Sequence, residues 1–106
     1  MISREQIQQF SDAIVAHFQP HRIILFGSHA AGHPSPHADV DLLVILDHEG
    51  SGLGKAAEIL THLQPPFAVD LIVRSPATIA QRLAWNDTFL RDVLEQGQVL
   101  YATPDE

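Results

Sequence analysis

Hydrophobic residues near the N-terminus recur every three or four positions, which is the spacing of one face of an α-helix. This stripe consists of Ile7, Phe10, Ile14 and Phe18. Ser3 and Gln6 have the spacing of a capping box, in which each side chain bonds the backbone N–H of the other residue. Because Pro20 cannot continue a helix, we expect a first helix that begins after Ser3 and ends before Pro20.

Three short segments are nearly continuous in hydrophobic residues, which predicts buried β-strands. They are residues 22–26, 40–46 and 67–73. In the second segment the apolar residues are nearly continuous over seven positions, with Asp41 as the exception, so we expect that strand at the centre of the sheet. Between the first two strands, residues 29–38 contain one Gly and two Pro and predict a loop, with one helical turn at 28–31 before it.

The second half of the chain alternates in the same way between helical and extended patterns. We expect a polar turn at 47–54 and a helix at 56–63 that Pro65 and Pro66 terminate. Ser75-Pro76 is a favoured helix start, and helical spacing follows to Leu94 with a break near Asn86. Residues 99–101 predict a short last strand. The pattern predicts an α/β fold, a small mixed β-sheet flanked by helices.

Composition narrows the range of possible functions. The chain has 106 residues, which suits a single domain over 1–106, and no cysteine, which excludes disulfides and thiolate chemistry. Six basic against 13 acidic residues give a net charge of −7, which disfavours binding to a nucleic-acid backbone. No apolar run approaches the length of a membrane helix, and the N-terminus does not resemble a signal peptide. We therefore expect a cytoplasmic protein.

Gly27 and Ser28 follow the first predicted strand directly. A glycine at such a turn lets the backbone approach a ligand, and the N–H groups at a helix start attract phosphate. Ser28 adds a hydroxyl group. The same two residues also suit an ordinary turn, so taken alone they do not decide between a phosphate site and a connection.

Asp39 and Asp41 flank the start of the second predicted strand. Alternate residues of a strand share a face, so both carboxylates point the same way, roughly 6.5 Å apart along the chain. Their mutual repulsion favours a bound Mg²⁺, which prefers carboxylate oxygens together with substrate phosphates. Alternatively, Asp39 caps the loop and Asp41 begins an edge strand in solvent.

Asp70 lies within the third predicted strand, between Val69 and Leu71. A carboxylate in a buried strand is costly unless it is paired or bound to a metal. Arg74 is one candidate partner. If the second and third strands are neighbours, Asp70 instead joins the first two carboxylates as a third acidic ligand, and three carboxylates beside a phosphate-binding turn suit two-metal phosphoryl transfer.

Together these motifs resemble the DNA polymerase beta-like nucleotidyltransferase superfamily. The resemblance rests on Gly27-Ser28, ten residues, then Asp39-x-Asp41, with Val69-Asp70-Leu71 in third place. The small size and the ending at 99–101 are similar to the minimal nucleotidyltransferases, the antitoxin half of HEPN/MNT toxin–antitoxin pairs. The resemblance implies the polymerase beta-like palm fold for this chain.

The resemblance also implies roles for individual residues. Gly27 and Ser28 would hold the β- and γ-phosphates of ATP, and His29 takes the place of an arginine frequent in the family. Asp39 and Asp41 would bind both of two Mg²⁺ ions, and Asp70 would bind the catalytic one and help to deprotonate the attacking hydroxyl. The implied reaction transfers AMP to a tyrosine of a HEPN-type toxin, with which the chain would form a hetero-oligomer.

Two other functions stay open. A binding antitoxin could block its toxin sterically with a vestigial site, because His29, Ala31 and Ala38 depart from the residues that many family members carry. A transferase could instead act on a small molecule such as an aminoglycoside. The sequence does not fix the acceptor, the nucleotide preference or the number of AMP units transferred.

Histidines and aromatic residues offer weaker candidate sites. His29, His33 and His37 would share a face of a continuous helix and could bind zinc, but Gly32 and the prolines between them argue against that helix. Asp47, His48 and Glu49 are expected in a solvated turn. Trp85 and Phe89 lie four apart, and we expect them on one helix as core or as a partner surface rather than as a base-stacking platform.

Overall fold

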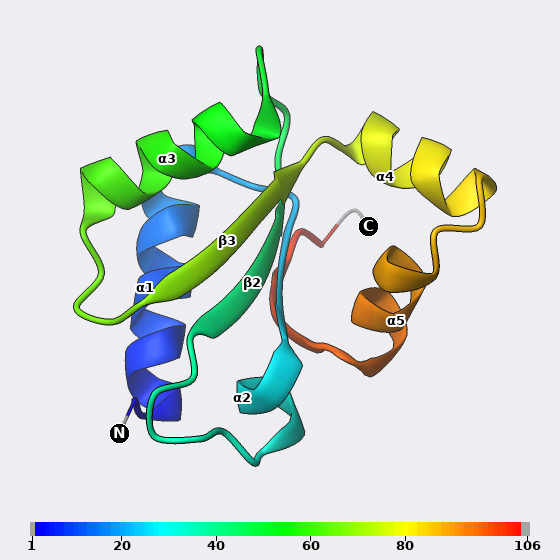
Figure 1. Cartoon of the computed structure of the whole chain (residues 1–106). Coiled ribbons are helices and arrows are strands. Elements are labelled where there is room, and N and C mark those ends of the chain that lie inside the picture. The colour runs from blue at the N-terminus through cyan, green and yellow to red at the C-terminus, as the bar shows by residue number, and fades with distance from the viewer. Residues whose placement is uncertain (1, 105–106) are drawn as a thin grey trace.

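The computed structural model describes residues 2–104, in which helices and strands alternate (Figure 1). The helices are α1 (Arg4–Phe18), α2 (Gly27–Ala31), α3 (Gly52–Leu63), α4 (Pro76–Ala84) and α5 (Thr88–Gln96). The strands are β1 (Arg22–Phe26), β2 (Val40–Ile45), β3 (Val69–Arg74) and β4 (Gln98–Ala102). None of the helices in this part of the chain has the length and apolar character needed to cross a membrane.

The four strands form one mixed sheet in the order β3-β2-β1-β4. β1 pairs antiparallel with both β2 and β4, whereas β2 and β3 run parallel. The predicted α/β class, the mixed sheet and the central position of residues 40–46 are confirmed. Parallel pairing requires a crossover between β2 and β3, and α3 provides it.

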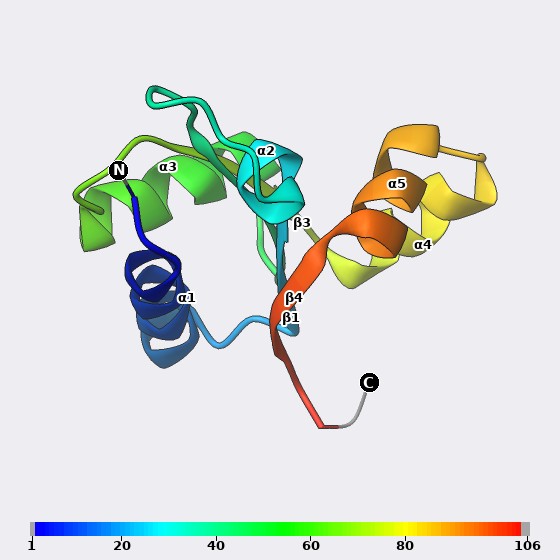
Figure 2. The same cartoon turned by 90° about the horizontal axis from the view of Figure 1, so that it is seen from below.

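Helices cover both faces of the sheet (Figure 2). Helices α1 and α3 pack on one face, where the core includes Ile14, Leu25 and Ile59. Helices α4 and α5 lie against the other face, whose smaller core includes Ile24, Leu43, Ile79, Leu90 and Val93. The capping box of Ser3 and Gln6 is present at the start of α1, as predicted.

Two predicted boundaries need correction. Helix α3 begins at Gly52 rather than at residue 56, because the Ser51 hydroxyl caps it by accepting a hydrogen bond from the Gly54 N–H at 2.9 Å. Strand β3 begins at Val69 rather than at residue 67, and Phe67 packs edge-to-face on Phe10 of α1 instead. The break near Asn86 is confirmed, since α4 and α5 are separate helices.

Candidate active site at one end of the sheet

Strand register brings two of the predicted site residues side by side. Asp41 of β2 lies opposite Asp70 of β3 on one side and opposite Phe26 of β1 on the other. Residues directly opposite each other project from the same face of a sheet. Asp41, Asp70 and Phe26 therefore form a row on the face that α4 and α5 cover in part.

Asp70 is exposed, which corrects our expectation of a buried carboxylate. The reason is that β3 is an edge strand, so residues at its start lie next to solvent. The alternative partner Arg74 stands at the opposite end of β3, and its Nη1 donates to the Val73 carbonyl at 2.8 Å. Asp70 instead has the Asp41 carboxyl as a hydrogen-bonding neighbour.

Gly27 places the backbone directly against the Asp41 carboxylate. The turn from β1 into α2 gives Gly27 a φ of +76°, a conformation that residues with a Cβ rarely adopt. A Cβ at this position would lie 2.2 Å from Asp41 Oδ2. Ser28, the next residue along the chain, is half-buried. Only glycine fits here, because the carboxylate occupies the space that a side chain would need.

The electrostatic environment raises the pKa of Asp41. Burial of its carboxyl group is the largest cause, followed by the negative charges of Asp70 and Asp39, while His29 acts in the opposite direction. A carboxylate that is disfavoured by its neighbours is stabilised by a bound cation. The repulsion among these carboxylates that the sequence predicts is thus present in the structure.

This pKa shift predicts a pH-dependent stability difference. A raised pKa means that the folded protein holds the Asp41 proton to higher pH than the unfolded chain does, so the shift lowers stability above about pH 4, the ordinary pKa of Asp. Without divalent cations, Asp41→Asn should therefore be more stable than the wild type at pH 7, and the gain should shrink as the pH falls toward 4. Denaturant unfolding in EDTA at both pH values measures this.

The control for this prediction is Asp92→Asn, which changes an exposed carboxylate on α5. We expect no comparable gain that depends on pH. An Asp41→Asn variant that is less stable than the wild type at pH 7 would contradict the proposed repulsion.

Asp39 and His29 lie at the same end of the sheet as the carboxylate pair. Asp39 is exposed, two residues before Asp41 and just outside β2. The His29 Nε2 atom lies 3.1 Å from the Ala38 carbonyl oxygen, so this ring links α2 to the loop that leads to Asp39. The residues predicted from the sequence are thus gathered around the end of β1 and the starts of β2 and β3.

The donor chemistry of this end of the sheet fits Mg²⁺, which prefers carboxylate oxygens and retains positions for substrate phosphates. Asp41 and Asp70 already touch, and Asp39 adds its charge to theirs. Within residues 2–104, however, no three side chains of His, Asp or Glu are close enough to form a complete metal site. The remaining positions around a cation would fall to Asp39, substrate oxygens and water.

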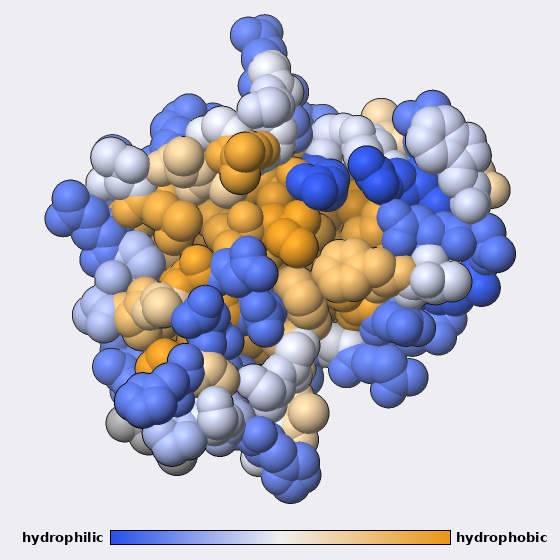
Figure 3. Space-filling view, in the orientation of Figure 1, coloured by the Kyte–Doolittle hydropathy of each residue, from blue (hydrophilic) through white to orange (hydrophobic). Residues whose placement is uncertain are grey.

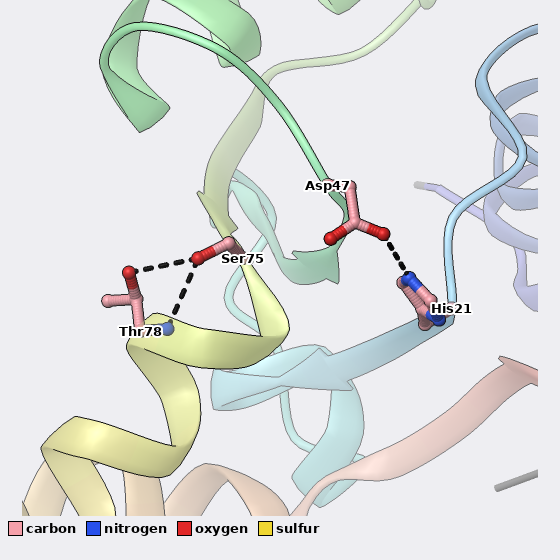
Figure 4. A network of polar contacts seen from close by, with 4 residues as sticks. All are labelled: His21, Asp47, Ser75 and Thr78. Atoms are coloured by element: carbon pink, nitrogen blue, oxygen red, sulfur yellow. Dashed lines mark hydrogen bonds and ion pairs between the residues drawn. The ribbon is translucent and has the colours of Figure 1, made fainter.

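The other polar candidates lie apart from this site. Helix α2 ends at Ala31, so His29, His33 and His37 do not share a helical face. At the opposite end of the sheet, Asp47 is exposed in the segment after β2, as expected, and its Oδ2 lies 2.6 Å from His21 Nε2 (Figure 4). In the same region Ser75 caps α4 by accepting a hydrogen bond from the Thr78 N–H. These contacts connect structural elements.

Sequence reasoning missed an aromatic pair beside the carboxylates. Phe89 of α5 packs edge-to-face on Phe26, with 5.6 Å between the ring centroids. Trp85 does not share a helix with Phe89, because it is the C-cap of α4, and it is 69% exposed. The expectation that both rings share one helix is therefore wrong, because the predicted break near Asn86 falls between them.

Comparisons with known proteins agree with this architecture. The model of the family described as "Nucleotidyltransferase domain" matches residues 7–100. Over 105 residues the chain is 30% identical to a protein of Methanocaldococcus jannaschii named "Putative protein adenylyltransferase MJ0604". The alignment covers 95% of this chain and 100% of that protein.

Two solved structures have a similar fold. One is a crystal structure of a toxin-antitoxin with AMP-PNP, with a TM-score of 0.58 and 21% identity over 92% of this chain and 75% of that chain. The other is a mutant of the toxin-antitoxin MntA-HpeT, with a TM-score of 0.53 and 18% identity over 98% of this chain and 76% of that chain. At these identities the similarity establishes a shared fold.

Proposed function

Because this chain belongs to the nucleotidyltransferase domain family, we propose that it transfers AMP from ATP to a hydroxyl group of a partner protein. The observation that carries the proposal is the close approach of Gly27 to Asp41, with Asp70 beside it. This arrangement puts a bare backbone turn against a pair of carboxylates, which suits a substrate that brings both phosphates and metal ions.

Each residue at this end of the sheet has a role in the proposed reaction. Gly27 and Ser28 bind the β- and γ-phosphates and so orient the α-phosphorus toward the carboxylates. Asp39, Asp41 and Asp70 would hold Mg²⁺, which supplies positive charge for the phosphates and for the entering and leaving oxygens. Asp70, exposed at the sheet edge, is the carboxylate that an acceptor hydroxyl can reach from outside.

The chemical step forms one bond to phosphorus and breaks another. The acceptor oxygen attacks the α-phosphorus in line with the bridging oxygen to the β-phosphate, and pyrophosphate leaves. Asp70 accepts the hydroxyl proton, which makes the attacking oxygen a better nucleophile. The product is an AMP phosphodiester on the acceptor.

We propose a HEPN-type toxin as the acceptor, modified on a tyrosine and thereby silenced in the cytoplasm. The M. jannaschii relative is named as a protein adenylyltransferase, which supports a protein acceptor. Proteins of the same fold occur in toxin-antitoxin structures, one of them with AMP-PNP, which supports a toxin partner and an adenine nucleotide. In this proposal the chain and the toxin form a hetero-oligomer.

The test follows the label from ATP in a purified mixture of the chain, Mg²⁺ and the co-expressed toxin. Label from α-labelled ATP should enter the toxin, label from γ-labelled ATP should not, and mass spectrometry should show an increment of one or more AMP units. Mutation of the acceptor tyrosine to phenylalanine should abolish labelling. Absence of α-label transfer would reject the proposed reaction.

The same mixture tests the alternative of a binding antitoxin. A sterically blocking chain would neutralise the toxin equally well without ATP and with Mg²⁺ chelated, and it would leave the toxin's mass unchanged. Labelling of an added aminoglycoside in place of the toxin would instead indicate a small-molecule transferase.

A further inference from the structure

Phe89 is an apolar residue of α5 whose side chain is partly exposed to solvent. It is 49% exposed, although its helix buries Leu90 and Val93 in the core. The ring packs edge-to-face on Phe26, with an angle of 84° between the planes. Edge-to-face packing uses the edge of one ring and leaves a flat face of the other free.

The position of this pair relates it directly to the candidate active site. Phe26 precedes Gly27 in the chain and lies opposite Asp41 across the β1–β2 pair, so its side chain projects from the same face as Asp41 and Asp70. Adjacent strands are about 4.8 Å apart, so Phe26 and Asp41 are close neighbours, and the Phe89 ring lies beyond Phe26 with 5.6 Å between the two ring centroids. A nucleotide whose α-phosphate is held at the carboxylates can extend toward Phe89 with its sugar and base.

Partly buried apolar side chains lie on the same face of the sheet as the carboxylates. Figure 3 shows hydrophobic residues gathered over the exposed sheet between α3 and the α4–α5 pair, with a polar group among them. Ile72, two residues after Asp70 and so on the same face of β3, is partly buried and packs against the same core cluster as Phe26. A flat uncharged ligand group therefore has apolar contacts from β3, β1 and α5.

We propose that Phe89 stacks on the nucleobase of the bound nucleotide, with Phe26 and Ile72 lining the same subsite. This inference rests on the proposed function, because it assumes that ATP is the donor. The base is the flat, aromatic and uncharged part of ATP, so it can lie on this apolar surface while the phosphates meet Gly27 and the carboxylate end of the sheet. A chain with a net charge of −7 gains from a binding contribution that does not depend on charge.

The experiment distinguishes the contribution of the base to binding from that of the phosphates by comparing two ligands. Binding of ATP and of inorganic tripolyphosphate, each with Mg²⁺, is measured by titration calorimetry on the full chain. In Phe89→Ala the Kd for ATP should rise about tenfold, within the range that one base–aromatic stack provides, while the Kd for tripolyphosphate stays unchanged. Phe89→Trp should retain ATP binding, because an aromatic face remains.

Two further variants control for folding and for exposed aromatic surface in general. Phe89→Leu keeps an apolar side chain against Phe26 but loses the flat ring, so it should weaken ATP binding while its melting temperature stays near that of the wild type. Trp85→Ala removes a more exposed ring from the end of α4 and should leave both affinities unchanged.

The outcomes distinguish this inference from the proposed function. Wild-type ATP binding that Phe89→Ala does not weaken overturns the stacking role alone, as does an equal loss for ATP and tripolyphosphate. Weaker binding of the partner protein with unchanged ATP affinity also overturns it and makes the surface a protein interface. Failure of the wild type to bind either ligand overturns the proposed function together with the inference.

Discussion

Replacing Asp39 and Asp41 together with asparagine should reduce AMP transfer by at least about a thousandfold. The physical reason is charge: asparagine keeps the size and the carbonyl oxygen but removes two negative charges that would hold Mg²⁺. A bound metal contributes several kcal/mol to transition-state stabilisation, and about 4 kcal/mol corresponds to roughly a thousandfold in rate. Transfer of label from α-labelled ATP to the toxin, followed over time, measures this effect.

The double variant should lose activity without losing its fold. Asp39 is exposed, and Asp41 carries a penalty from burial and from its neighbours, so neutral side chains there relieve repulsion. We therefore expect a melting temperature in EDTA at or above that of the wild type, and an intact complex with the toxin. Asp92→Asn, an exposed change on α5, should retain full transfer. Equal labelling by the double variant and the wild type would refute the role of these carboxylates.

Local sequence patterns predicted most of the fold because short-range physics determines these elements. The capping box at Ser3 and the Ser75-Pro76 helix start depend on neighbouring residues only, and both α1 and α4 begin where expected. Helix α3 was placed too late because its first turn contains Gly52 and Gly54, which have no apolar side chain to mark a periodic face. That turn forms because of the Ser51 cap.

The gathering of the three aspartates at one end of the sheet was predictable from the sequence, but the exposure of Asp70 was not. Strand spacing and the alternation of helices and strands indicated that Asp39, Asp41 and Asp70 would lie near one end of a sheet. Exposure of Asp70 depends on the order of strands, since β3 is an edge strand, and strand order is a long-range property. The Phe26–Phe89 contact joins β1 to α5 across most of the chain, so no local spacing reveals it. The catalytic roles of these residues stay predictions.

Gly27→Ala should be the most damaging single change outside the carboxylates, with a loss of transfer of about a hundredfold or more. The new Cβ would lie 2.2 Å from Asp41 Oδ2, so either the turn or the carboxylate has to move. A displacement of about 1 Å in a reacting group can cost about a hundredfold in rate. The left-handed φ of +76° adds a backbone cost of roughly 1–2 kcal/mol in stability.

Gly50→Ala separates these two effects, because it carries the backbone cost without the steric contact. Gly50 has a φ of +72°, and a Cβ there would meet no atom within 4 Å. It lies in the turn before α3, at the opposite end of the sheet from Asp41. Gly50→Ala should lose stability in denaturant unfolding from the backbone cost alone, and Gly27→Ala at least as much, but only Gly27→Ala should lose transfer. If Gly50→Ala lost as much transfer as Gly27→Ala, the defect would come from general destabilisation, and the close approach of Gly27 to Asp41 would have no special part in the reaction.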